Sequence, residues 1–450
     1  MNKQFDLIVI GTGAAGATAA YKCRSAGWEV AIADARPFGG TCALRGCDPK
    51  KVLVGAAELV DWQHRMARRA VVTNGLKIDW PALMRFKRTF TEPVPKNREE
   101  GYAKAGIATL HDRARFIGPT TLEVGDQVLT GRHVLIANGA RPATLAIRGE
   151  EHLTTSDQFL ELDRLPPRIL FVGGGYISFE FAHIAAQAGA QARVLHRGSR
   201  PLAGFDSDLV DQLVRATREI GVDVRLNTTV EGIERGRGQL IVHALAEGVR
   251  QTFEAEMVVH GAGRVPEIDD LGLEAAGVRW GQKGVVVNEY LQSVSNPAVY
   301  AAGDSAASGG LPLTPVASLE GHVVASNLLE GNHRTPDYTG VPTVVFTVPS
   351  LASIGLQEET ARQRGLKFRA KHGDTGEWYS SRRVGVRHSG FKVLIEEGTE
   401  RILGAHLLGP HAEEVINLFA LAIRAGLRAA DLKTMPWAYP TSSSDVSYMV

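Results

Sequence analysis

Two segments of this chain follow the same pattern: an apolar run, a glycine-rich turn, a stretch of small residues and a second apolar run. The first copy runs from Leu7 to Asp34 and places Gly11, Gly13 and Gly16 at its turn. In a strand–helix–strand unit, the first glycine allows a tight turn, the second lets backbone approach a pyrophosphate, and the third allows close helix–strand packing. The pattern therefore predicts a unit that binds a dinucleotide.

Both ends of the first copy support this prediction. Ala14 and Ala15 open the expected helix, whose unpaired N–H groups and positive dipole end suit phosphate groups. Asp34 closes the second apolar run at the spacing that accepts a hydrogen bond from a ribose hydroxyl. Cys23 lies within the helical stretch, and we expect it to be a buried packing residue.

The second copy begins near Arg168 and ends near Leu195. Its turn is the triple glycine Gly173–Gly175, and Ser178 stands where the first copy has its last glycine. Serine is still small enough for tight helix–strand packing, so a second dinucleotide unit is predicted. Two such units in one chain usually bind two different dinucleotides, and flavin enzymes use them for FAD and for a nicotinamide donor.

The residues after the second copy indicate which nicotinamide is used. His196, Arg197 and Arg200 follow the strand, where an acidic residue would select the free 2′-hydroxyl of NAD. Cations at this place suit the 2′-phosphate of NADP, and the Arg197 guanidinium can bind a phosphate through two N–H groups. The alternative is a solvated turn. We expect NADPH to be preferred over NADH.

Composition excludes several other classes of protein. A chain of 450 residues suggests about three domains, and 44% hydrophobic with 22% charged residues is ordinary for a soluble protein with a large core. The net charge of +1 predicts neither nucleic-acid nor membrane binding. No apolar run approaches the ~20 residues that span a bilayer, and no signal-peptide pattern precedes the first strand. We expect a cytoplasmic protein.

Segment 39–51 holds a close pair of cysteines, Cys42 and Cys47, and Cys23 is the third cysteine of the chain. Three cysteines make no disulfide framework, and in a reducing compartment a close pair is usually metal-binding or catalytic. A zinc site needs about four ligands, and no second CxxC or HxxxH cluster completes one. A redox pair is the favoured interpretation, and two buried small residues are the alternative.

These features and several motifs in the same order resemble the pyridine nucleotide-disulfide oxidoreductases, which include glutathione reductase, dihydrolipoamide dehydrogenase and mercuric reductase. The resemblance covers essentially all 450 residues, and the joint occurrence of the motifs carries it. Beyond the two glycine-rich units, the motifs are Cys-x4-Cys-x-Pro-x-Lys ending at Lys51, HVLIANGARP from His133, Gly263-Arg264-x-Pro266, the pair Gly303-Asp304 and VPTVVFTVPSLASIGL from Val341.

The resemblance implies an α/β fold with two Rossmann-like dinucleotide-binding domains and a C-terminal α+β dimerisation domain. The expected division is 1–148 and 269–334 for the two parts of the FAD-binding domain, 149–268 for the NAD(P)H-binding domain and 335–450 for the interface domain. His411–Leu427 has helical apolar spacing, and its family counterpart packs at the dimer two-fold. We therefore expect a homodimer.

The resemblance also implies roles for individual side chains. Cys47 matches the thiol that lies against the flavin, and Cys42 matches the thiol that attacks the substrate. Lys51 matches the lysine near flavin N5, and Glu180 matches its ion-pair partner. Tyr176 matches the ring that gates the nicotinamide pocket.

Further residues are expected to line the two cofactor sites. Asp304 matches the carboxylate that holds the FAD ribityl chain. Thr314 starts the helix after Leu313 and should direct N–H groups at the flavin N1/O2 edge. The remaining residues expected at FAD are Gly40, Thr41, Ala137, Asn138, Gly139, Arg264 and Gly303, and those expected at the nicotinamide cofactor include Gly173, Gly175, Ile177 and Gly263. No metal ligands are expected.

The C-terminal segment departs from the family pattern. Disulfide reductases of the family end in His-Pro-x-x-x-Glu, and the His moves protons for the thiols. Aligned on Pro440-Thr441, this chain has Tyr439 in place of His and Ser444 in place of Glu, with Asp445 one residue late. Tyrosine titrates near ~10, so it cannot cycle the same proton easily. It can donate a hydrogen bond and cover a metal-bound thiolate pair, and mercuric reductase also has a tyrosine in this region.

A second departure lies inside the cysteine motif. Asp48 follows Cys47, where the family usually has an apolar residue. An acid beside the flavin-proximal thiol should oppose thiolate formation. Arg45 and Lys50 are nearby cations that could compensate.

Three functions stay open on the sequence. The first is an FAD-dependent NAD(P)H oxidoreductase that passes electrons from NADPH through FAD to a Cys42–Cys47 redox disulfide. Its acceptor would be a soft metal ion, as in mercuric reductase, a quinone or another acceptor that needs no His general acid. The second is a reductase of a small disulfide, with water, Tyr439 or a distant histidine as the proton donor. The third is a flavoprotein redox sensor with slow turnover.

Overall fold

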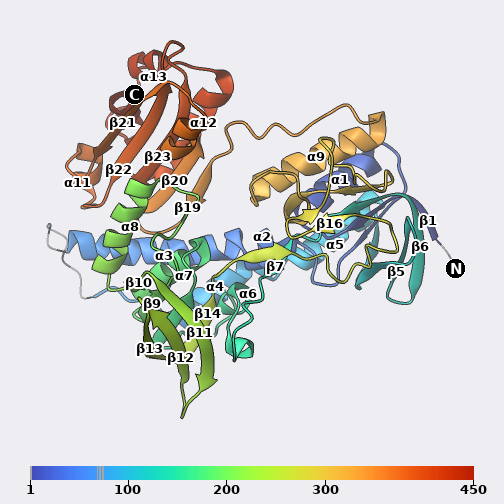
Figure 1. Cartoon of the computed structure of the whole chain (residues 1–450), viewed down its shortest axis with the longest axis horizontal. Coiled ribbons are helices and arrows are strands. Elements are labelled where there is room, and N and C mark those ends of the chain that lie inside the picture. The colour runs from blue at the N-terminus through green and yellow to red at the C-terminus, as the bar shows by residue number, and fades with distance from the viewer. Residues whose placement is uncertain (1–2, 68, 70–71, 73–74) are drawn as a thin grey trace. The chain divides into compact units, whose positions relative to one another are not determined.

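Figure 1 shows a computed structural model of the chain, which describes residues 3–67, 69, 72 and 75–450. The chain forms two compact units, and each is described by itself. The first comprises the described residues of Met1–Lys50, Phe86–Ala143 and Arg264–Tyr338, and the second those of Lys51–Arg85, Thr144–Gly263 and Thr339–Val450. The two units combine segments of the chain in another way than the expected domains do. The expected domain boundaries therefore remain a prediction.

The first unit is built on a mixed sheet with strand order β3-β2-β1-β6-β5-β4, and β18 also pairs with β6. β1 pairs in parallel with β2 and β6, and its last four residues are buried, as expected for a strand that is covered on both faces. The strands of the unit are β1 (Lys3–Ile10), β2 (Val30–Ala33), β3 (Ala108–Leu110), β4 (Ala114–Phe116), β5 (Thr121–Val124), β6 (Gln127–Ile136), β7 (Ala140–Pro142), β15 (Arg264–Pro266), β16 (Trp280–Gly281), β17 (Gly284–Val285) and β18 (Val299–Ala301).

Two helices of the first unit, α1 and α9, pack side by side (Figure 1). Gly321 allows the close approach, because a Cβ at this position would lie 2.5 Å from the Ala15 carbonyl oxygen. Other small residues of α1, such as Ala19 and Ala20, are buried as well. The helical elements are α1 (Ala14–Ser25), α2 (Gly40–Arg45), α5 (Val94–Ala105), η2 (Gly303–Ser305) and α9 (Thr314–Glu330), while α3 (Cys47–Met66) and α4 (Trp80–Thr91) each run across a boundary between the units.

The second unit contains three sheets: a parallel sheet β10-β9-β8-β14, an antiparallel sheet β11-β12-β13 and an antiparallel sheet β19-β20-β23-β22-β21. The strands are β8 (Arg168–Val172), β9 (Gln191–Leu195), β10 (Asp223–Arg225), β11 (Thr228–Arg235), β12 (Leu240–Ala246), β13 (Val249–Ala255), β14 (Met257–His260), β19 (Thr343–Val345), β20 (Ser350–Gly355), β21 (Phe368–Asp374), β22 (Gly390–Glu396) and β23 (Ile402–Gly409). The helical elements are η1 (Glu150–His152), α6 (Ser156–Phe159), α7 (Tyr176–Gln187), α8 (Ser207–Glu219), α10 (Glu358–Gln363), α11 (Tyr379–Arg383), α12 (Ala412–Ala425), α13 (Ala429–Thr434), η3 (Ser442–Asp445) and α14 (Val446–Met449).

A buried ion cluster links α8 to the C-terminal sheet within the second unit. The ammonium group of Lys392, on β22, lies 2.9 Å from Asp206, 2.6 Å from Asp208 and 3.2 Å from Glu358. Only 4% of the Lys392 side chain and 3% of the Asp206 side chain are exposed. Asp206 also caps α8 by accepting hydrogen bonds from the backbone of its first turn.

The predicted fold class is confirmed. β1-α1-β2 and β8-α7-β9 are both parallel strand–helix–strand units, and β9 ends at Leu195 as expected. The predicted helix at His411–Leu427 is α12, which lies beside the C-terminal antiparallel sheet. None of the helices in the described part of the chain has the length and apolar character that a membrane crossing requires.

Candidate active site

The first glycine turn has the geometry that a pyrophosphate needs. Gly11 has φ +103°, and a Cβ there would lie 2.3 Å from the Ala137 carbonyl oxygen. A Cβ at Gly16 would lie 2.1 Å from the Gly11 oxygen, whereas one at Gly13 would meet no atom within 4 Å. Gly13 is also the N-cap of α1 and provides no side-chain cap. The backbone at Gly13 is therefore open to a ligand, and the first N–H groups of α1 can bind its phosphates.

Asp34 organises the loop after this turn. Its carboxylate accepts hydrogen bonds from the backbone N–H and the hydroxyl of Thr12, at 2.9 and 2.7 Å, and from the Arg36 N–H at 3.0 Å. The Thr12 hydroxyl in turn accepts from the Gly39 N–H at 3.1 Å. A carboxylate has about four acceptor positions, so Asp34 can still bind a ribose hydroxyl. Our sequence reasoning missed Thr12, although a hydroxyl residue between the first two glycines was a visible signal.

The cysteine motif begins next to the same turn. Gly40 has φ +72°, and a Cβ there would lie 2.5 Å from the Gly13 Cα atom. It opens α2, which carries Thr41 and Cys42, and Gly46 separates α2 from α3. Helix α3 begins at Cys47, so the second thiol stands at the positive end of a helix of 20 residues.

The two thiols have unequal environments. Cys42 and Cys47 are not joined by a disulfide; Cys42 is partly buried and Cys47 is exposed. Hydrogen bonding to the Cys47 sulfur raises the pKa of Cys42 well above its usual range, and burial raises it further, while the Thr314 hydroxyl opposes the shift. The pKa of Cys42 is therefore raised by its immediate surroundings, while Cys47 stands at the helix end where the α3 dipole favours negative charge.

Asp48 contributes to this asymmetry through Cys42. The Cys42 thiol donates to the Asp48 carboxylate, with 3.8 Å between Sγ and Oδ1. The charge of Asp48 also raises the pKa of Cys42. We predicted an effect of Asp48 on its neighbour Cys47, and the contact with Cys42 was not predicted.

Three further residues of the first unit fit a flavin cofactor. The Oδ1 atom of Asn138 is buried and makes no hydrogen bond within the described residues, so it is available to a ligand donor. Burial raises the pKa of Asp304, and the nearby Arg264 opposes that shift. Thr314 begins α9 as expected, and its N-cap, Leu313, offers no side-chain cap. These groups suit the polar edge of a bound flavin.

Lys51 and Glu180 meet around Phe346 in the second unit. The Lys51 ammonium lies 4.7 Å from the centre of the Phe346 ring and 3.2 Å from Glu58. Glu180, on α7, is 1% exposed and accepts a hydrogen bond from the Phe346 N–H at 2.8 Å. The ion pair between Lys51 and Glu180 that the resemblance implies stays a prediction. Phe346 and Glu58 carried no sequence signal.

The second glycine turn has the same kind of backbone geometry as the first, and the structure shows why Ser178 fits where the first turn has a glycine. Gly173 has φ +107°, and a Cβ there would lie 2.5 Å from the Gly261 oxygen. Ser178 is fully buried in α7, and a Cβ at Gly261 would lie 2.1 Å from its Oγ atom. Gly261 therefore provides the space that the serine takes up. Tyr176, the first residue of α7, is 47% exposed, and Ile177 follows it.

The three basic residues after β9 differ in whether their side chains are available to bind a phosphate. The Nε2 atom of His196 lies 2.9 Å from the Arg200 carbonyl oxygen. Burial lowers the pKa of His196, and the charge of Arg197 lowers it further. His196 therefore contacts the backbone of its own loop, and its role at the nucleotide stays a prediction. Arg197 and Arg200 are exposed and carry the positive charge that suits a 2′-phosphate.

The C-terminal segment contains no acid–base pair at Tyr439. Tyr439 is 78% exposed. The Ser444 hydroxyl donates to the Thr441 carbonyl oxygen at 2.6 Å and is 7% exposed. Asp445 lies on the wall of a cavity, where burial raises its pKa and a hydrogen bond with Ser380 opposes that shift. Ser444 and Asp445, the two residues near the expected Glu position, therefore form hydrogen bonds with Thr441 and Ser380.

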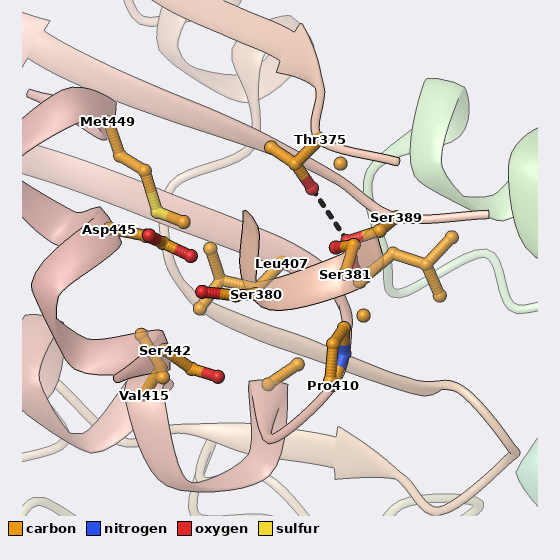
Figure 2. Close-up of a pocket in the computed structure, with 14 residues that line it drawn as sticks. Thr375, Ser380, Ser381, Ser389, Leu407, Pro410, Val415, Ser442, Asp445 and Met449 are labelled. Carbon is orange, nitrogen blue, oxygen red and sulfur yellow. Dashed lines mark hydrogen bonds between the residues drawn. The ribbon is translucent and has the colours of Figure 1, made fainter. Parts of the chain in front are cut away.

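The pocket beside Asp445 is small and is lined by residues of the C-terminal part of the second unit. Figure 2 shows its hydroxyl-rich wall and the hydrogen bond between Thr375 and Ser389. It contains none of the residues expected at the redox site. Among the described residues, no group of three or more His, Cys, Asp or Glu side chains could hold a metal ion.

Comparison with known families gives two matches. Residues 5–321 match the family described as pyridine nucleotide-disulphide oxidoreductase. Residues 341–450 match the dimerisation domain of the same family.

Two of the similar proteins match most of the chain, and a third matches a part of it. A glutathione reductase from Burkholderia cepacia is 34% identical, with 98% of this chain and 97% of that protein covered. A mercuric reductase from Staphylococcus aureus is 32% identical, with 95% and 78% covered. An uncharacterized 19.7 kDa protein in a mercuric resistance operon of Staphylococcus aureus is 50% identical and is covered completely, over 40% of this chain.

A solved structure resembles the whole chain. It is a Cu(II) complex of the HOCl-induced flavoprotein disulfide reductase RclA from Escherichia coli, with a TM-score of 0.89 and 28% sequence identity. The match covers 100% of this chain and 99% of that one.

Proposed function

Because this chain belongs to the pyridine nucleotide-disulphide oxidoreductase family, we propose that it passes electrons from NADPH through FAD to the Cys42–Cys47 pair and on to a soft metal ion. The enzyme is an FAD-dependent disulfide oxidoreductase with NADPH as electron donor, and its dimerisation domain indicates a homodimer. The metal ion is the proposed substrate and would be held by the two sulfurs, since thiolates select soft cations.

The cofactor sites use groups described above. Gly13 and the first N–H groups of α1 would hold the FAD pyrophosphate, Asp34 the ribose and Asp304 the ribityl chain. Arg197 and Arg200 would hold the 2′-phosphate of NADPH. FAD, when bound, accepts hydride from the nicotinamide and supplies two electrons to the cysteine pair.

The contact between Cys42 and Asp48 is the observation that carries the proposed acceptor. A thiol that donates to a carboxylate at 3.8 Å is stabilised in its protonated form. A metal cation overcomes this effect by itself, because coordination deprotonates a thiol outright. Attack on a disulfide needs a base instead, and Tyr439 is a poor one near neutral pH because tyrosine titrates near ~10.

The proton balance of the two reactions also favours a metal ion as the acceptor. NADPH and a divalent metal ion give NADP⁺, the neutral metal and one released proton, so no acid is needed. NADPH and a disulfide give NADP⁺ and two thiols, and that reaction takes up a proton. The mercuric reductase and the mercuric resistance operon protein among the relatives support a mercury-like acceptor.

The test is NADPH oxidation by the purified homodimer with Hg(II), Cu(II), a quinone and glutathione disulfide as separate acceptors. We expect turnover with Hg(II) that is lost in Cys42→Ser and in Cys47→Ser. Faster turnover with glutathione disulfide than with any metal ion would overturn the proposal in favour of the second candidate, a small-disulfide reductase, which the 34% identity to glutathione reductase supports. If the enzyme reduces only O2, and does so slowly, the redox sensor would be the favoured function.

A further inference from the structure

A buried carboxylate in the first unit holds together three distant parts of the chain. Glu320 lies on α9 and is 1% exposed. Its Oε2 atom accepts a hydrogen bond from the Gly303 N–H at 2.6 Å, and its Oε1 atom accepts one from the Tyr338 hydroxyl at 2.6 Å. The Ser308 hydroxyl also hydrogen-bonds to it. Burial raises the pKa of Glu320, and the hydrogen bonds from Ser308, Tyr338 and the Gly303 backbone oppose that shift, so these donors stabilise its charged form.

The first partner belongs to the turn that presents Asp304. Gly303 has φ +68°, which favours glycine, and a Cβ there would lie 3.4 Å from the Ala317 Cβ atom. It opens η2, whose second residue is Asp304. A hydrogen bond to a charged acceptor is about twice as strong as a neutral one, so Glu320 strongly favours one conformation of this turn.

The second partner of Glu320 is Tyr338, which lies at the end of the first unit. Tyr338 is the last residue of that unit. A Cβ at Gly310 would lie 2.8 Å from the Tyr338 ring and 2.9 Å from the Glu320 Oε1 atom, so the ring and the carboxylate both lie against the backbone there. Tyr338 and the Gly303 N–H therefore bind different oxygens of the same carboxylate.

We propose that Glu320 and Tyr338 are positioning residues that hold the Gly303–Asp304 turn in the conformation that binds FAD. This inference rests on the proposed FAD site, in which Asp304 binds the ribityl chain. Neither side chain is assigned a contact with the cofactor. Their effect passes through the backbone of Gly303, and Tyr338 sets the direction of the carboxylate.

The experiment compares FAD affinity among full-length holoenzyme variants by flavin fluorescence after serial dilution, with the thermal unfolding midpoint as a second readout. Glu320→Ala leaves the Gly303 N–H and the Tyr338 hydroxyl unpaired, and we expect the FAD dissociation constant to rise about tenfold or more. Glu320→Gln keeps one acceptor and should restore most of the affinity. Tyr338→Phe should raise the constant about threefold.

Two further variants make the result decisive. Tyr300→Phe is the matched control, because the Tyr300 hydroxyl donates to Asn332 at 2.8 Å in the same unit, whereas the hydrogen bonds of Glu320 seen among the described residues involve Gly303, Ser308 and Tyr338. We expect it to lower the unfolding midpoint without weakening FAD. The double variant Glu320→Ala/Tyr338→Phe should bind FAD no more weakly than Glu320→Ala alone, since both changes break one unit.

The outcomes separate the two proposals. Unchanged FAD affinity in Glu320→Ala, or equal weakening in Tyr300→Phe and Tyr338→Phe, would overturn the positioning role. Additive losses in the double variant would also overturn it. A wild-type protein that binds no FAD would contradict the assigned cofactor itself.

Discussion

The thiol of Cys42 donates a hydrogen bond to the carboxylate of Asp48, with 3.8 Å between Sγ and Oδ1. Because of this contact, the two thiols of the pair have different electrostatic surroundings. Hydrogen bonding to Cys47, burial and the charge of Asp48 all raise the pKa of Cys42, and Cys47 stands at the start of α3. An acceptor that removes the proton by binding to sulfur is therefore favoured over one that needs a base.

Asp48→Asn should make Cys42 more reactive. The negative charge of Asp48 raises the pKa of Cys42, so its removal lowers that pKa and increases the thiolate fraction at neutral pH. Site-resolved alkylation of the reduced enzyme, measured by mass spectrometry across pH, should show the Cys42 profile moved to lower pH. Cys23 is an internal control, because burial raises its pKa to about 12 and no contact with Asp48 is recorded. An unmoved Cys42 profile would show that Asp48 has no such effect.

Tyr439→His/Ser444→Glu should create a disulfide reductase if the rest of the pocket still binds one. A positioned base contributes about 10²–10⁴-fold, and we expect a gain of at least about tenfold with glutathione disulfide and none with Hg(II). Tyr439→His alone is the control for the buried Ser444 position, and the unfolding midpoint checks that the fold is kept. An equal gain with both acceptors would contradict the proton argument.

The order of the two nucleotide units could be predicted from the sequence because glycine spacing reports local backbone geometry. β2 and the end of β9 lie where the apolar runs placed them. Ser178 was correctly accepted as a small packing residue, but its actual partner is Gly261, a long-range contact that no local pattern encodes.

The contacts inside the candidate site could not be predicted in the same way. Phe346 lies far along the chain from Lys51 and Glu180, yet it contacts both. The approach of Asp48 to Cys42 depends on the backbone path through Gly46 between α2 and α3. Such contacts follow from tertiary packing, which residue spacing does not specify.

Arg197→Ala should impair use of NADPH and leave NADH unaffected. The exposed guanidinium is placed to bind the 2′-phosphate, and loss of a charge-assisted pair predicts a rise in KM for NADPH of about tenfold or more. Steady-state kinetics with both nucleotides give the comparison. Arg250→Ala is the control, since Arg250 is 87% exposed elsewhere in the same unit. A matching rise in KM for NADH would show that Arg197 does not recognise the phosphate.

Lys392→Met should destabilise the second unit. Lys392 and Asp206 are almost fully buried, and breaking such a pair costs about 3–5 kcal/mol because a buried charge is left uncompensated. Thermal unfolding followed by circular dichroism measures the loss, with the exposed Lys367→Met as control. A loss no larger than that of the control would contradict the assigned role.

The same cluster predicts how stability depends on pH. The pKa values of Asp208 and Glu358 are lowered by hydrogen bonds, first from Lys392 to Asp208 and from Arg362 to Glu358. Their stabilisation is therefore present above the unfolded carboxyl pKa values near ~4 and is lost as pH falls through the folded values. The unfolding midpoint of the wild-type protein should fall on acidification, and that of Lys392→Met should fall less.

The most direct test of the proposed function is single-turnover reoxidation of the NADPH-reduced homodimer by Hg(II) and by glutathione disulfide, each followed from pH 6 to pH 9. We predict that Hg(II) reoxidises the wild-type enzyme at a rate that varies little with pH, and that Cys42→Ser and Cys47→Ser fail to react. Glutathione disulfide should react far more slowly and should speed up as pH rises. Rapid reoxidation by glutathione disulfide at pH 6, with Hg(II) slower, would contradict the proposed acceptor.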